Sequence, residues 1–213
     1  MNKSFWAIIA VIVIVFGGIL IFNKHDAKAP ASNSAKPTQH IEGQGKAGVT
    51  LVEYGDYQCP FCGEFFPVVK EVVDKYQDQI HFQFRNLPLL QVHRNAMAAA
   101  RAAEAADMQG KFWQMHDMLY QNQTSWAESN SASSIFEQYA GSLGLNVTKF
   151  KQDAASSHVN DIINADIAAF NQTGNEMSTP TFFLDGKKIQ PAGLSLDDFS
   201  KLIDPEIAAK QKQ

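Results

Sequence analysis

Residues 49–62 read VTLVEYGDYQCPFC, and this stretch predicts a strand, a short turn and the start of a helix. Val49–Tyr54 is short, β-branched and apolar, as in a buried strand. Pro60 suits the first turn of a helix, because its missing N–H is one that such a turn leaves unpaired anyway. We therefore expect Cys59 and Cys62 at the N-terminus of a helix.

The chain has only these two cysteines, and they lie three positions apart. A disulfide that only stiffened the fold is a poor explanation for them. Closing so short a loop removes about 2 kcal/mol of unfolded-chain entropy, against about 4.7 kcal/mol for a 100-residue loop. A zinc site would need a second ligand pair, and none of the six histidines forms one. We therefore predict a chemically active pair, with no metal and no cofactor.

The position at a helix N-terminus explains how such a pair would react. A free thiol with a pKa of about 8.5 is only about 3% ionised at pH 7, and the thiolate is the nucleophile. Backbone N–H groups and a partial charge of about +0.5 at a helix N-terminus favour the anion. We expect Cys59 to face solvent and attack, and Cys62, one turn further on, to be more buried and to resolve the mixed disulfide.

Further strands are predicted on both sides of a long helical block. Ile80–Phe84 alternates apolar and polar residues, so strand, helix and strand form a right-handed parallel unit. Near the end, strands at 181–184 and 187–190 flank Asp185-Gly186, a strong hairpin signal. Ser195 then caps a last helix. The expected order is β-α-β, the helical block, then β-β-α.

The helical block covers about residues 91–174. Ala96–Ala106 is rich in alanine, a strong helix former. Ser134 and Glu137 have the spacing of a capping box, which predicts a helix start there. Val159–Phe170 carries apolar residues at helical spacing, as an amphipathic helix does.

The N-terminus predicts a membrane segment. Phe5–Phe22 has no charged or strongly polar residue and would span about 27 Å as a helix, close to the hydrocarbon core of about 30 Å. We expect residues 1–24 to be an uncleaved anchor, a flexible linker over 25–47, and a folded domain over 48–213. The alternative is a signal peptide cleaved near 27–29, although its apolar stretch would be shorter, about 7–15 residues.

Composition excludes one class of partner. The net charge is -4 and no basic cluster is longer than Lys187-Lys188. Nucleic-acid binding requires a basic face, so we expect none.

Two motifs together identify a family resemblance. Cys59-Pro60-Phe61-Cys62 follows a predicted strand, and Thr179-Pro180-Thr181 precedes the hairpin. A trans peptide before Pro180 is the default from base rates, whereas a cis peptide would expose the backbone of Thr179 beside the cysteines. From about Gly48 to its end the sequence resembles the DsbA-like branch of the thioredoxin superfamily. The resemblance implies a thioredoxin fold with an inserted helical domain.

The resemblance also implies an activity. Substrate thiols in reduced exported proteins attack the Cys59–Cys62 disulfide and leave oxidised, and a DsbB-like or VKOR-like membrane partner re-oxidises the pair. Thr179 and Pro180, with Pro60 and Phe61, bind the substrate. We expect a monomer with its catalytic domain outside the cytoplasm. An extracytoplasmic reductase or isomerase, and a non-catalytic membrane-tethered binding module or chaperone, are the alternatives.

Glu53 corresponds to an acidic residue that the family carries beneath the buried cysteine. A carboxyl on a buried strand is costly when charged, so it can hold a proton near neutral pH and exchange it with Cys62. The alternative is an ordinary surface glutamate. Two departures leave the redox poise open: Phe61 stands where the best-known enzymes have His, and Thr179 where strongly oxidising members have Val.

Overall fold

The computed structural model describes residues 35–212. The predicted anchor over 1–24, the cleavage site near 27–29 and most of the predicted linker lie outside these residues. Among the helices that are described, none is both long enough and apolar enough to cross a membrane.

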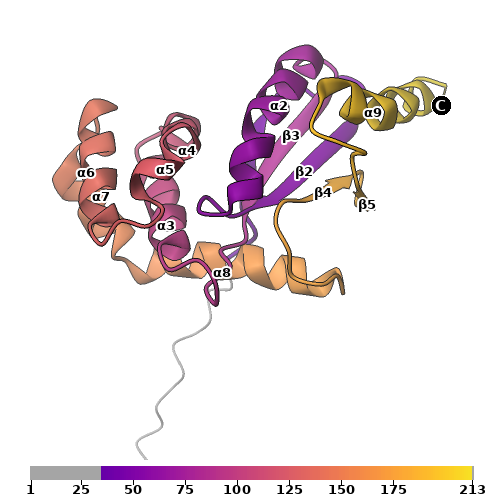
Figure 1. Cartoon of the computed structure of the whole chain (residues 1–213). Coiled ribbons are helices and arrows are strands. Elements are labelled where there is room, and N and C mark those ends of the chain that lie inside the picture. Colours follow the sequence, from indigo (N-terminus) through magenta and orange to yellow (C-terminus); the bar gives the residue numbers. More distant parts are fainter. Residues whose placement is uncertain (1–34, 213) are drawn as a thin grey trace, which may run out of the picture. The chain divides into compact units, whose positions relative to one another are not determined.

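The described residues form a five-stranded sheet with the strand order β1-β3-β2-β4-β5 (Figure 1). β2 and β3 are parallel, whereas β1 pairs antiparallel with β3, and β4 pairs antiparallel with both β2 and β5. This confirms the predicted α/β class and the predicted order of elements along the chain, to which the structure adds β1. The strands are β1 (His40–Glu42), β2 (Val49–Gly55), β3 (Ile80–Asn86), β4 (Thr181–Leu184) and β5 (Lys187–Ile189).

The linker predicted over 25–47 is wrong at its end, because β1 lies inside it. β1 pairs with the edge of β3, with His40 opposite Phe84. Just before it, buried Thr38 donates from its backbone N–H and its hydroxyl to Asp166, at 2.7 and 2.8 Å. Three residues of mixed polarity give no strand signal, and partners distant in the sequence hold them in place.

The helices α2 (Pro60–Tyr76) and α9 (Leu196–Lys210) belong to the thioredoxin-like part. They pack on the sheet and on each other. Pro60 is the first residue of α2, as predicted. Ser195 caps α9 by accepting a hydrogen bond from the Asp198 N–H, as predicted. The β4–β5 hairpin turns at Asp185 and Gly186, whose φ angles of 47° and 81° both lie in the left-handed region.

Along the chain, six helices follow β3 and precede β4, which confirms the helical insertion. Figure 1 shows these helices beside the sheet. One predicted start is wrong: α6 begins before Ser134, and Glu137 instead pairs with Lys151 at 3.0 Å. The helices are α3 (Ala96–Asp107), α4 (Phe112–Gln121), α5 (Gln123–Trp126), α6 (Ala132–Ser142), α7 (Val147–Ala154) and α8 (Ser157–Gln172).

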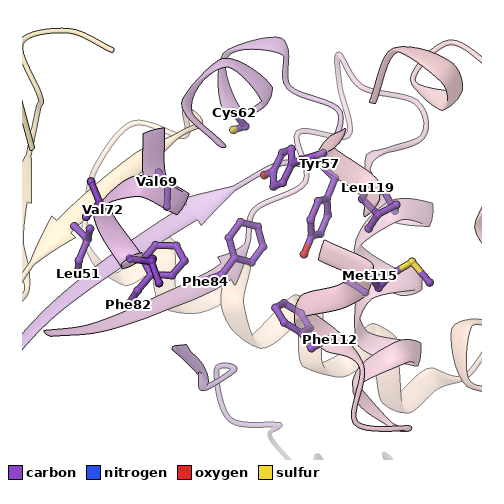
Figure 2. Packing of buried hydrophobic residues seen from close by; sticks show 14 of the residues in the cluster. Leu51, Tyr57, Cys62, Val69, Val72, Phe82, Phe84, Phe112, Met115 and Leu119 are labelled. Atoms are coloured by element: carbon purple, nitrogen blue, oxygen red, sulfur yellow. The ribbon is translucent and has the colours of Figure 1, made fainter. Parts of the chain in front are cut away.

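The largest hydrophobic cluster contains residues of both the sheet and the insertion (Figure 2). This cluster contains Leu51 of β2, Val72 of α2 and Phe84 of β3, together with Phe112 and Met115 of α4. All five side chains are nearly inaccessible to solvent. Because one core serves both parts, the insertion is held at a fixed position beside the first turn of α2.

Candidate active site

The two cysteines lie at the start of α2, after the short loop that follows β2. Cys59 is the N-cap residue of α2 with extended backbone angles, and Cys62 lies within the first turn of the helix. Both are free thiols. Cys62 is fully buried, as predicted, but the prediction that Cys59 faces solvent is wrong, since it is only 4% exposed. Thr179 covers it: the Cys59 thiol donates to the Thr179 carbonyl at 3.4 Å.

The surroundings of Cys59 stabilise its anion. A hydrogen bond from the Cys62 side chain is the main cause that lowers the pKa of Cys59 to about 6, and it outweighs the opposing effect of burial. The Thr179 side chain and the backbone N–H groups of Phe61 and Cys62 lower this pKa further. The Thr179 hydroxyl is buried and has no other partner among the described residues, so it is free to donate to a thiolate.

Cys62 has the opposite character. Burial, and after it the interaction with Cys59, raises the pKa of Cys62 well above its ordinary value. The pair therefore shares its charge unequally: a single negative charge resides on Cys59, and Cys62 keeps its proton. This asymmetry is the property that an attacking thiol and a resolving thiol require.

Glu53 lies in the middle of β2, between Phe84 of β3 and Phe182 of β4. It is 3% exposed, so it is not an ordinary surface residue. Burial, with a smaller contribution from the charge of Cys59, raises the pKa of Glu53 to about 8. A carboxyl with this pKa holds its proton at pH 7. Its assignment as a proton donor to Cys62 stays a prediction.

A groove lies next to Cys59 and has a volume of about 200 Å³. Thr179 and Pro180 form part of its lining, and the peptide bond between them is cis. Phe61 lines it from α2 and is 64% exposed. Pro60 is exposed but does not line this groove. The sequence therefore identified the two segments that meet here, although they are 120 positions apart.

The sequence did not identify a set of polar contacts that hold the loop before Cys59. The buried Asp56 carboxylate accepts hydrogen bonds from the backbone N–H groups of Gln58 and Leu89, both at 2.8 Å, and contacts His93 Nδ1 at 2.7 Å. The Gln58 side chain accepts from the Asn95 N–H at 2.6 Å. Apart from Gln58, the partners of Asp56 and the partner of the Gln58 side chain lie 33 to 37 positions away, and only the tertiary fold brings them together.

Two histidines of the helical insertion contact this loop. His93 contacts Asp56, and His116 Nδ1 lies 3.1 Å from the hydroxyl of Tyr57. Burial lowers the pKa of His116 well below its ordinary value, so this imidazole is neutral. Both contacts arise because the insertion folds back onto the loop before Cys59.

One group among the described residues has ligand atoms close enough to hold a cation, namely His40, Glu104 and Asp107. Each nitrogen of His40 already faces a carboxylate, Glu104 at 2.9 Å and Asp107 at 3.6 Å. Glu104 also accepts a hydrogen bond from the Asn86 side chain at 2.7 Å. These contacts account for the group as packing around β1, and we assign no metal to it.

Comparison with known families and structures agrees with this geometry. The family model described as Thioredoxin matches residues 35–205. BdbD from Bacillus subtilis, in its oxidised form, is 26% identical with a TM-score of 0.66, covering 82% of this chain and 97% of that one. Alpha-DsbA1 from Wolbachia pipientis is 22% identical with a TM-score of 0.69, covering 83% of this chain and 94% of that one.

Curated relatives of higher identity are longer proteins. Two named Na(+)/H(+) antiporter NhaA, from Salinispora arenicola and Salinispora tropica, are 36% and 38% identical over 154 and 149 residues. The matches cover 70% of this chain, but this chain spans only 22% of the length of each relative. The similarity therefore concerns one portion of those proteins.

Proposed function

This chain belongs to the thioredoxin family and has the fold of its DsbA-like members, and we propose that it introduces disulfide bonds into exported proteins. An oxidoreductase activity is what this fold implies. One observation carries the more specific proposal: a cysteine with a pKa of about 6 lies beside a groove, and its partner cysteine is fully buried. A low pKa stabilises the reduced form, so the oxidised form is a better oxidant.

The proposed reaction moves two electrons from substrate to enzyme. A substrate thiolate attacks Sγ of Cys59 in the Cys59–Cys62 disulfide, a new sulfur–sulfur bond forms, and Cys62 leaves. A second substrate thiolate then attacks the substrate sulfur of this mixed disulfide, and Cys59 leaves as a stable thiolate. The substrate has lost two electrons and two protons and gained a disulfide, and the cysteine pair is reduced.

Glu53 would supply the proton that Cys62 needs. Because the pKa of Cys62 is raised well above its ordinary value, a Cys62 thiolate formed in the first step takes up a proton at once. Glu53 is buried with a pKa of about 8 and carries a proton at pH 7. The transfer moves the negative charge from Cys62 to Glu53, whose pKa is the lower of the two, and Glu53 then regains a proton from solvent.

The groove beside Cys59 would bind an extended stretch of substrate. Thr179 and Pro180 would contact the substrate backbone, while exposed Phe61 and its neighbour Pro60 offer apolar contacts. A DsbB-like or VKOR-like membrane protein would accept the two electrons. We place the enzyme outside the cytoplasm as a monomer on its N-terminal anchor, where a disulfide persists.

An extracytoplasmic reductase is the second candidate, and one observation favours it. Phe61 occupies the position of a histidine in the best-known oxidases, and its ring cannot offer a positive charge to Cys59. The extreme thiol acidity of those enzymes is therefore not expected here. The redox state of the pair in intact cells separates the two candidates, since an oxidase is kept oxidised and a reductase is kept reduced.

The test traps thiols in intact cells with an alkylating agent and resolves the two redox forms by gel mobility. We expect a mostly oxidised pair, and we expect Cys62→Ser to accumulate mixed disulfides through Cys59. The matched control is Cys59→Ser, which should form none. A mostly reduced pair would exclude the oxidase, and unchanged exported disulfides in the Cys59→Ser strain would favour a binding module or chaperone.

A further inference from the structure

One side chain of the helical insertion holds the backbone on both sides of Gln58. Gln123 is the first residue of α5, and its Nε2 donates to the carbonyl oxygens of Tyr57 at 2.7 Å and Cys59 at 2.9 Å. The Cys59 carbonyl also accepts the Gly63 N–H at 3.1 Å, the first backbone bond of α2. The carboxamide thus contacts the turn that carries the reactive sulfur.

Gly63 makes this approach possible. A Cβ atom at this position would lie 2.6 Å from Oε1 of Gln123 and 3.1 Å from its Cδ. Gly is otherwise an unfavourable residue inside a helix, because it gives up the most conformational freedom on folding. Its place in the first turn of α2 is therefore explained by the close packing of the Gln123 side chain.

Gln123 is itself held by its surroundings. Trp126, three residues on, is fully buried and donates from Nε1 to the Leu119 carbonyl at 2.9 Å. The Asn95 side chain donates to the carbonyls of Trp126 and Ala127, at 3.2 and 2.9 Å. The short helix α5 is thus fixed to the N-cap residue of α3 and to α4, so the Gln123 carboxamide is positioned before any substrate arrives.

We propose that Gln123 is a positioning residue that stabilises the Cys59 thiolate through the backbone of residues 57–59. A carbonyl oxygen carries a partial negative charge, and the Cys59 carbonyl belongs to the same residue as the sulfur. An N–H donor compensates part of that charge and fixes the direction in which the carbonyl points. Gln123 therefore favours the anion and with it the reduced pair. The inference rests on the proposed function of Cys59.

The first test replaces Gln123 with Met in the full chain, which removes both donors and keeps most of the volume. We expect the equilibrium constant for oxidation by glutathione to rise about fivefold, the factor that one hydrogen bond is worth. The pKa of Cys59, followed by thiolate absorbance, should rise with it. Gln123→Glu, which places a charged acceptor there, should shift both quantities further in the same direction.

The control is Gln109→Met. Gln109 lies in the same insertion, and its side chain also makes two hydrogen bonds to backbone, the N–H and the carbonyl of Asn146. This change should leave the glutathione equilibrium at its wild-type value. A purely structural role for Gln123 would destabilise the oxidised and reduced forms equally, and the equilibrium constant would not move.

A double-mutant cycle with Gly63→Ala tests the packing argument. The added methyl group should displace the carboxamide and shift the equilibrium in the same direction as Gln123→Met, and it should add no further shift in that background. Additive shifts, or no shift from Gln123→Met, would overturn the inference. A wild-type pair that did not exchange with glutathione at all would instead overturn the proposed function.

Discussion

The acidity of Cys59 makes a quantitative prediction about the stability of the reduced protein. Its pKa falls from 9.0 to about 6 on folding, chiefly because the Cys62 side chain donates a hydrogen bond to it. A group whose pKa is depressed by folding stabilises the folded state above its unfolded pKa, and this contribution is lost as the pH falls through the folded pKa. The relevant window is therefore about pH 9 down to about pH 6.

The magnitude follows from the two pKa values. Linkage gives almost no stabilisation at pH 5, about 1.4 kcal/mol at pH 7 and about 2.7 kcal/mol at pH 8. Solvent in the groove beside Cys59 screens part of this charge, so we expect about 2 kcal/mol between pH 5 and pH 8. The oxidised protein has no thiolate and should lack this contribution.

The perturbation is Cys59→Ser, and the measurement is urea unfolding under reducing conditions at several pH values. The free energy of unfolding of wild type minus that of the variant should rise by about 2 kcal/mol from pH 5 to pH 8. Glu53 is present in both proteins, so the subtraction removes most of its effect. A difference that stays constant over this range would refute the assignment of Cys59 as the acidic thiol.

Three further changes have defined outcomes. Thr179→Val removes a hydroxyl that stabilises the thiolate, so the pKa of Cys59 should rise and its alkylation at pH 6 should slow. Folding raises the pKa of Glu53 from 4.5 to about 8, a contribution that is lost as the pH rises, so Glu53→Gln should gain about 3 kcal/mol in urea unfolding between pH 4 and pH 7 relative to wild type. The same variant should slow formation of the mixed disulfide in stopped-flow mixing with a substrate dithiol, because Cys62 then leaves without its proton donor. Ser195→Ala removes the cap of α9 and should cost about 1 kcal/mol at every pH, measured by thermal unfolding.

The elements that the sequence predicted correctly are those that local rules determine. Pro60 begins α2 because the first helical turn does not need its N–H, and Asp185-Gly186 closes the hairpin because both residues accept a positive φ. The strand β1 follows no such rule, and it is held by pairing with β3 and by contacts between Thr38 and Asp166, which are 128 positions apart. The predicted cap at Ser134 failed although its spacing was right, because a motif of this kind does not fix where a helix begins.

The residues of the candidate site also fall into two groups, those that belong to short sequence motifs and those that only the fold brings to the site. Cys59, Cys62 and Thr179 could be predicted because each belongs to a short motif, and the fold then brings two distant motifs together. Gln123 belongs to no motif, and it lies 64 positions from the Cys59 carbonyl that it contacts. Gly63, in contrast, is a visible irregularity inside a predicted helix, and its cause lies in that distant side chain. A sequence can thus show that the first turn of α2 is constrained, whereas only the packed insertion identifies the constraint and ties it to the reactivity of the sulfur.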